Sequence, residues 1–315
     1  MIKLIFGLVP LLLFLKLVGL PDIDRSFIHK FEKPRMTTLL PEGHSKVQFT
    51  INIITNDRPE SLKRLLKSIE RANYYNNTVN IRFSMDADAD KVTMDIVDKY
   101  NWEIGHKTVQ KRIKKGGLMK AVAESWYPAS DNDHAIFLED DVEVSETYFD
   151  WVLFALDNYG TNESSLVGVS LYNPKFSEVS GEKVAIPPEA YLYQFPSSWG
   201  CLFFAKGWKE FNLYISSMIY DESKPFIPMS RTNNWQNSWK KYFVSYMYDH
   251  GKYMLYPPVS FSTNHVEPGT HYKTPSKFTL DRLRVGLYRG KYNLPPKRFS
   301  ELPVLNIYGT TSRIN

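Results

Sequence analysis

The strongest constraint on the fold is an alternation of strand-like and helix-like segments between residues 46 and 159. Residues 46–55 alternate apolar and polar side chains with the period of a strand, and 59–69 repeat apolar residues with the period of a helix. Further strands are predicted over 79–85, 104–109 and 134–138, and further helices over 90–100, 118–126 and 145–159. This order predicts an α/β fold with a mostly parallel central sheet and helices on both of its faces.

The second half of the sequence is less regular and rich in aromatic residues. A strand is predicted over 199–204, and helices over 208–218 and 235–250. For the aromatic side chains of these helices, core packing is favoured over a substrate platform. Trp199, which stands beside Gly200, is instead a candidate for lining a sugar site.

The N-terminal segment points to the secretory pathway. Residues 4–20 are apolar except for Lys16, and no small-residue cleavage site follows them. An uncleaved signal anchor over 1–20 is therefore favoured over a cleaved signal peptide or a buried helix. Lys3 before the apolar run predicts a single-pass type II protein of the Golgi or ER membrane with a lumenal domain, and a secreted protein is the less favoured alternative.

The remaining chain divides into a stem over 21–45, a catalytic domain over 46–275 and a peripheral C-terminal tail over 276–315. Its net charge of +5 is scattered, so a nucleic-acid partner is not indicated. Cys201 is the single cysteine, which excludes an intramolecular disulfide and a zinc site built from cysteines.

An acidic triplet follows the strand predicted over 134–138. Glu139, Asp140 and Asp141 stand side by side, where they repel one another and lose hydration free energy unless a cation neutralises them. Oxygen-only ligands favour Mn²⁺ or Mg²⁺. An acidic cap on the following helix is the alternative explanation.

Polar residues also end two other predicted strands. Asp86 and Asp88 follow the strand over 79–85, and Thr55, Asp57 and Arg58 follow the first strand. The carboxyl ends of parallel strands meet at one edge of a sheet, which is where ligands gather. Together with the triplet, these residues predict a site for a nucleoside diphosphate and a metal ion.

Three segments, TNDRPESLKRLLKSI, SMDAD and FLEDDVEVSETYFDWV, resemble the GT-A glycosyltransferases. They are similar to glycosyltransferase family 2 and to animal N-acetylglucosaminyltransferase I, whose acidic motif is likewise Glu-Asp-Asp. A closer resemblance is to a poorly characterised plant and microbial family of predicted glycosyltransferases. It is carried by Trp126-Tyr127-Pro128, by Trp199-Gly200 and by Trp208-Lys209-Glu210-Phe211.

The resemblance implies a metal-dependent glycosyltransferase of the hexosyl or N-acetylhexosaminyl type, which moves a sugar from a UDP-linked donor to a glycan or glycoconjugate acceptor with inversion. It implies that Asp86 contacts the uracil or ribose, that Glu139 lies near the ribose, and that Asp141 ligates Mn²⁺ or Mg²⁺ with Asp140 as the second carboxylate. Lys115 is expected beside the donor, close to Gly116 and Gly117; a solvated basic face over 111–115 is the alternative.

The sequence departs from the resemblance at the catalytic base. In N-acetylglucosaminyltransferase I an acidic pair lies between two tryptophans, whereas 235–239 here reads WQNSW. Glu210 is preferred as the base over Asp221 and Glu222. His265 is a candidate metal ligand, with an ordinary surface histidine as the alternative. Two other functions stay open: a catalytically inactive homologue that binds sugar nucleotides or glycans, and a nucleotidyltransferase on a similar sheet.

Overall fold

The structure is a computed structural model that describes residues 47–160, 163–220, 226–236, 238–265 and 283–313. Residues 45–315 form one compact unit. The expected anchor over 1–20 and stem over 21–45 lie outside the described residues, as do residues 266–282. Among the helices that are described, none has both the length and the apolar character needed to cross a membrane. The membrane anchor and the lumenal location stay predictions.

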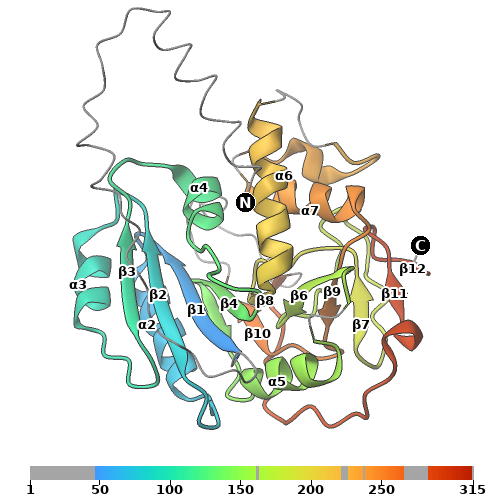
Figure 1. Ribbon diagram of the computed structural model, residues 1–315, viewed down its shortest axis with the longest axis horizontal. Coiled ribbons are helices and arrows are strands. Elements are labelled where there is room, and N and C mark those ends of the chain that lie inside the picture. The colour runs from blue at the N-terminus through green and yellow to red at the C-terminus, as the bar shows by residue number, and fades with distance from the viewer. Residues whose placement is uncertain (1–46, 161–162, 221–225, 237, 266–282, 314–315) are drawn as a thin grey trace, which may run out of the picture. The chain divides into compact units, whose positions relative to one another are not determined.

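The elements follow the alternation that the sequence predicts (Figure 1). The strands are β1 (Gln48–Thr55), β2 (Val79–Met85), β3 (Lys107–Lys111), β4 (Asp133–Glu139), β5 (Val142–Val144), β6 (Leu166–Ser170), β7 (Tyr191–Tyr193), β8 (Cys201–Phe203), β9 (Tyr253–Tyr256), β10 (Ser262–Asn264), β11 (Val304–Leu305) and β12 (Thr311–Ser312). The α-helices are α2 (Pro59–Glu70), α3 (Lys91–Lys99), α4 (Gly117–Ala123), α5 (Tyr148–Asn158), α6 (Ala205–Tyr220) and α7 (Trp239–Asp249), and short 3₁₀-helices lie at Arg231–Asn234 and Phe299–Glu301.

A ten-stranded sheet with the order β12-β11-β7-β9-β6-β8-β4-β1-β2-β3 forms the centre of the fold. Strands β3, β2, β1 and β4 are parallel neighbours, whereas β8 is antiparallel to both β4 and β6. The fold is therefore mixed α/β: the first half is fully parallel, whereas the second half combines parallel pairs, β6 with β9 and β7 with β11, with antiparallel ones. Both kinds of connection occur there: no α-helix lies between β6 and β7 or between β7 and β8, whereas α6 and α7 lie between β8 and β9.

The strand order reverses at β1. The chain moves outward from β1 to β2 and β3, and then crosses back to place β4 on the other side of β1. Right-handed crossovers require the connecting helix to change faces when the direction reverses. Helices α2 and α3 pack on one face through Leu65 and Val97, and α4 packs on the other through Val122. The expectation of helices on both faces is confirmed.

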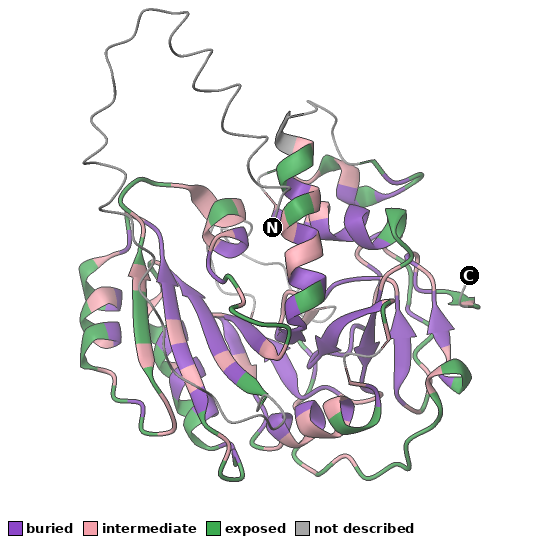
Figure 2. Ribbon diagram, viewed as in Figure 1, coloured by how far each residue is buried: buried purple, intermediate pink, exposed green. Residues whose placement is uncertain are grey.

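Two apolar cores hold the sheet between these layers. On β1, Ile51 and Ile53 face the core beneath α2, α3 and α5, whereas Ile54 faces the core beneath α4, α6 and α7. The aromatic residues of α6 and α7 are buried, including Trp208 and Phe243, which confirms their expected packing role. Figure 2 shows that the inner strands are buried and that β3 is largely accessible at the edge of the sheet.

The C-terminal segment contributes to the same sheet. Strand β11 pairs with β7 and β12 pairs with β11, and the side chains of Leu302 and Ile307 are buried. The part of 276–315 that the structure describes therefore forms the outer edge of the sheet opposite β3.

The close approach of β6 to β8 depends on Gly168. A Cβ added to Gly168 would lie 2.2 Å from the Leu202 carbonyl oxygen, which belongs to the neighbouring strand. We expect Gly168→Ala to lower the free energy of unfolding by about 2–3 kcal/mol, because the backbone of two central strands must separate. Urea unfolding followed by circular dichroism measures this change.

Gly286→Ala is the matched control. A Cβ at Gly286 meets nothing within 4 Å, so its effect should lie between no change and a gain of about 1 kcal/mol. Equal stabilities of the two variants would contradict the close packing of β6 against β8.

Candidate functional site

The acidic triplet lies where the strand order reverses. Strands β1 and β4 run side by side to their carboxyl ends, with Ile54 opposite Glu139. Arg58, just after β1, forms ion pairs with both Asp140 and Asp141, the latter at 2.9 Å. The Thr55 hydroxyl donates a hydrogen bond to Asp140 Oδ2 at 3.0 Å. The structure therefore brings Thr55, Arg58 and the triplet together, as the sequence predicts.

Arg58 neutralises only part of the acidic charge. Burial raises the pKa of Asp140 to about 6, although the Arg58 guanidinium opposes this. Burial, together with the charges of Asp141 and Asp140, raises the pKa of Glu139 to about 8. The carboxyl group of Glu139 accepts no hydrogen bond from any residue that the structure describes. Near neutral pH the metal-free protein thus keeps Glu139 largely protonated.

Asp86 holds the glycine loop before α4. Its carboxylate accepts hydrogen bonds from the backbone N–H groups of Gly116 at 2.9 Å and Gly117 at 2.8 Å. Burial alone would raise the pKa of Asp86, but these hydrogen bonds and one from Ala87 lower it. Gly117 has a φ of +71°, a conformation that side-chain-bearing residues rarely adopt. Asp86 is thus an ionised residue that fixes this loop at the carboxyl edge of β2.

The other residues expected beside the donor are more exposed. Lys115 lies 2.6 Å from Asp88, and their side chains are 70% and 43% exposed. Asp57 is exposed in the turn after β1, and its side chain has no hydrogen bond or ion pair to the residues described. Both Lys115 and Asp57 border the cluster on the β2 side without contacting the triplet.

A small second sheet supports Asp141. Strand β5 directly follows the triplet and pairs with β10, whose Asn264 donates a hydrogen bond to Asp141 Oδ1 at 3.2 Å. His265 reaches the Asp141 carbonyl through its backbone N–H, but its Nε2 atom lies 2.9 Å from Glu143. The structure thus places His265 next to the triplet with Glu143, and not Asp141, as its side-chain partner.

Glu210, the expected catalytic base, lies near the amino end of β4, whereas the triplet lies at its carboxyl end. It is on α6, where it contacts Lys252 at 2.7 Å, and the same ammonium group binds the Ser164 carbonyl. Lys252 and Ser164 precede β9 and β6, which run parallel to β4, so all three residues lie at the amino ends of the strands. The choice of Glu210 is therefore corrected: a helix that starts after an antiparallel strand begins at the wrong edge of the sheet.

Two residues at the acidic edge were missed by sequence reasoning. Lys240, at the start of α7, is 5% exposed and contacts Glu178 at 2.5 Å. Its ammonium group also lies 5.0 Å from the ring centroid of Trp199, which is the candidate sugar-site residue. Lys240 follows the WQNSW segment directly, but its partner is 62 residues away, and no local pattern indicates that pairing.

The triplet suits a metal ion that arrives with a phosphate group. Within the part of the chain that is described, no three His, Cys, Asp or Glu side chains are grouped so as to hold a metal by themselves. Mg²⁺-type ions at nucleotide sites need only one or two protein carboxylates, because phosphate oxygens and water complete the coordination. Asp140 and Asp141 supply such a pair, with Arg58 already bridging them. These residues fit a divalent ion completed by a diphosphate.

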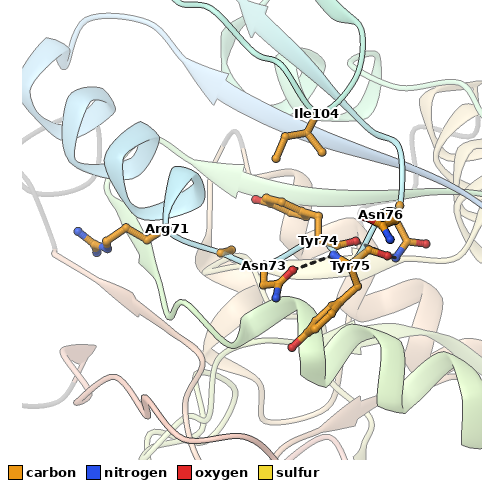
Figure 3. Close-up of a pocket in the computed structure, with 8 residues that line it drawn as sticks. Arg71, Asn73, Tyr74, Tyr75, Asn76 and Ile104 are labelled. Atoms are coloured by element: carbon orange, nitrogen blue, oxygen red, sulfur yellow. Dashed lines mark hydrogen bonds between the residues drawn. The ribbon is translucent and has the colours of Figure 1, made fainter.

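A separate pocket lies at the other end of β2 (Figure 3). It is lined by 71–77 and Ile104 and has a volume of about 470 Å³. The Ile104 carbonyl accepts a hydrogen bond from Val79, the first residue of β2, which places the pocket at the amino edge. None of its lining residues is acidic, so this pocket is not part of the acidic cluster.

The family described as the SPBC1E8.03c C-terminal domain matches residues 57–224, which is more than half of the 315 residues. The chain belongs to this family. The matched region begins in the turn after β1 and extends past the end of α6, and it contains Arg58, Asp86 and the whole triplet. Among curated proteins no match was found. The resemblance to glycosyltransferase family 2 and to N-acetylglucosaminyltransferase I stays a prediction.

Several glycosyltransferase structures are distantly similar. Residues 1–349 of S. aureus TarS in complex with UDP-GlcNAc share 13% identity at a TM-score of 0.45, over 71% of this chain and 60% of that one. The mannosyltransferase PcManGT of Pyrobaculum calidifontis, in complex with GDP-Man and Mn²⁺, shares 11% identity at a TM-score of 0.45. The match covers 72% of this chain and 59% of that one. GalNAc-T7 with UDP, GalNAc and Mn²⁺ shares 14% identity at a TM-score of 0.45. The match covers 69% of this chain and 43% of that one. This chain thus spans at most about three fifths of these three chains.

The raised pKa of Glu139 has a measurable consequence for stability. In EDTA, the free energy of unfolding of the wild-type protein should fall as the pH rises from about 4.5 to about 8, because the folded state keeps a proton on Glu139 that the unfolded chain releases. Glu139→Gln should remove the fall above pH 6 and be more stable than wild type at pH 8 by roughly 2–4 kcal/mol. Urea unfolding at pH 5, 6, 7 and 8 measures both slopes.

In Glu139→Gln, the free energy of unfolding should still fall with rising pH below about pH 6, because the raised pKa of Asp140 is unchanged in that variant. Glu103→Gln, at an exposed position in the loop before β3, is the control and should follow the wild-type profile. An unchanged slope between pH 6 and 8 in Glu139→Gln would show that Glu139 is already ionised there.

Proposed function

We propose that this chain is a GT-A-type glycosyltransferase that moves a sugar from a nucleotide-diphosphate donor, UDP-linked, to a glycan or glycoconjugate acceptor. The observation that carries the proposal is the position of Arg58, Asp140 and Asp141 at the point where the strand order reverses. In sheets of this kind, ligands bind outside the carboxyl ends of the strands at that switch point. A site with one half-buried arginine and several acids is suited to a diphosphate that comes with a metal ion.

Different residues are proposed to bind different parts of the donor. Asp86 holds the Gly116–Gly117 loop beside the carboxyl end of β2, and we assign this side of the site to the nucleoside. Arg58 lies between the ends of β1 and β4 and is placed to exchange one carboxylate partner for a phosphate oxygen. When bound, Mn²⁺ or Mg²⁺ would supply charge stabilisation for the departing diphosphate, with Asp141 and Asp140 as its protein ligands.

The proton of the acceptor hydroxyl needs a different acceptor from Glu210, which lies across the sheet. Inversion at the transferred carbon is part of the proposal and rests on the resemblance alone. Product analysis separates the proposal from the two other functions: a glycosyltransferase releases nucleoside diphosphate, a nucleotidyltransferase releases pyrophosphate, and an inactive binder releases neither. A panel of nucleotide sugars incubated with the purified protein and Mn²⁺ tests this directly.

Asp141→Asn tests the metal and donor site. The variant should lose at least about ten-fold in UDP affinity in Mn²⁺, because a charged ligand is replaced by a neutral one, and little in EDTA. Isothermal titration with UDP, in Mn²⁺ and in EDTA, measures both affinities. Asn has the size of Asp and keeps one of the two acceptor oxygens that Arg58 and Asn264 use, which limits the structural disturbance.

Asp131→Asn provides the matched control. Asp131 is an exposed acid just before the amino end of β4, paired with Lys209 at 3.0 Å, so the same substitution is made near the other end of the same strand. It should leave UDP affinity unchanged in both conditions. Equal UDP affinity of wild type and Asp141→Asn in Mn²⁺ would overturn the assignment of Asp141.

A further inference from the structure

We propose that Trp199 and Glu178, held in place by Lys240, form a subsite for a pyranose ring beside the acidic triplet. The inference rests on the proposed function, since it takes this ring to be the sugar of the donor or of the acceptor. The sugar is then bound on the β8 side of the acidic triplet, and the nucleoside on the β2 side.

Trp199 lies next to the triplet because of strand pairing. It precedes β8, and Cys201 at the start of β8 pairs with Phe137 on β4, two residues before Glu139. The backbone there depends on Gly200, which has a φ of +95° and where an added Cβ would lie 3.0 Å from Ser262 Oγ. The entry to β8 thus holds Trp199 at the carboxyl edge of β4.

Lys240 organises the polar part of the subsite. Its ammonium group contacts Glu178 at 2.5 Å and Ser198 at 3.2 Å, and it lies 4.7 Å from the ring centroid of Phe195 and 5.0 Å from that of Trp199. A buried ion pair of this kind contributes little net stability compared with apolar residues of the same size. What it does provide is a fixed position for the Glu178 carboxylate beside the Trp199 indole.

The exposed parts of these residues match the chemistry of a sugar. Trp199 is partly exposed, and Tyr172 packs edge-on against it at 4.8 Å and 74°, which fixes the plane of the indole. Glu178 uses Oε1 to bind Lys240, while Oε2 receives no hydrogen bond from the residues that are described. A pyranose has an apolar face of C–H groups that stacks on an aromatic ring, and hydroxyls that donate to a carboxylate.

Strand register links this group to the triplet. Phe137 on β4 pairs with Cys201 on β8 in an antiparallel register, and two residues further on that register brings Trp199 level with Glu139. A ring seated on Trp199 therefore lies beside the carboxylates that are proposed to hold the diphosphate. Both the sugar of the donor and the accepting sugar must approach this point, so the experiment has to separate the two sources.

The test compares Trp199→Ala and Glu178→Gln with wild type in Mn²⁺. Calorimetric titration with UDP, UDP-glucose, UDP-galactose, UDP-GlcNAc and UDP-GalNAc gives the gain in affinity due to the sugar. If the subsite holds the donor sugar, both variants should lose that gain by about ten-fold or more and keep UDP affinity. If it holds the acceptor, donor affinities should stay unchanged while binding to a glycan array is lost.

Two controls report on folding and on surface charge. Trp199→Phe keeps an aromatic face and should retain most of the binding, and Glu182→Gln makes the same substitution at an exposed position four residues after Glu178. Wild-type-like titrations and array binding for both Trp199→Ala and Glu178→Gln would overturn the subsite. Array binding that depends on Trp199, in a protein that binds no UDP, would overturn the proposed function and leave the subsite standing.

Discussion

The handedness of β-α-β crossovers determines where this protein can build a site. Because each crossover is right-handed, moving from β3 back to β4 obliges α4 to pack on the face opposite α2 and α3. The helices on the two sides of β1 therefore pack on opposite faces of the sheet. Strand pairing alone brings together the residues just beyond β1 and β4. Arg58 therefore contacts Asp140 and Asp141, which lie 82 and 83 positions further along the chain.

The charge at this edge is only partly balanced within the chain. Three adjacent carboxylates suggest a metal ion when the sequence is considered alone, but the structure supplies Arg58 as an internal cation for two of them. Glu139 is then left half-buried beside two anions, and its desolvation together with their charges raises its pKa. A metal ion and a diphosphate would therefore enter a site in which Arg58 already offsets part of the acidic charge.

The first half of the fold could be predicted from the sequence because its signals are local. The alternation in β1, the apolar stripe of α2 and the acids after β2 and β4 each lie within about a dozen residues. The second half was predicted less well. Strands β5, β7, β8 and β10 have three residues each, too few for a period to appear, and their partners lie far away in sequence. Glu210 was placed at the wrong edge because the direction of β8 decides where α6 begins.

The same distinction separates the two halves of the candidate site. Residues on the nucleoside side, such as Asp86 and its glycine loop, lie on the parallel half, where strand ends alone fix their positions. Residues on the β8 side come from separate loops and a helix: Glu178 before β7, Trp199 before β8 and Lys240 in α7. Their geometry depends on one buried ammonium group that contacts both Glu178 and the rings around it. The position of Trp199 depends in addition on the pairing of β8 with β4, so this side of the site is fixed only when the second half of the sheet is complete.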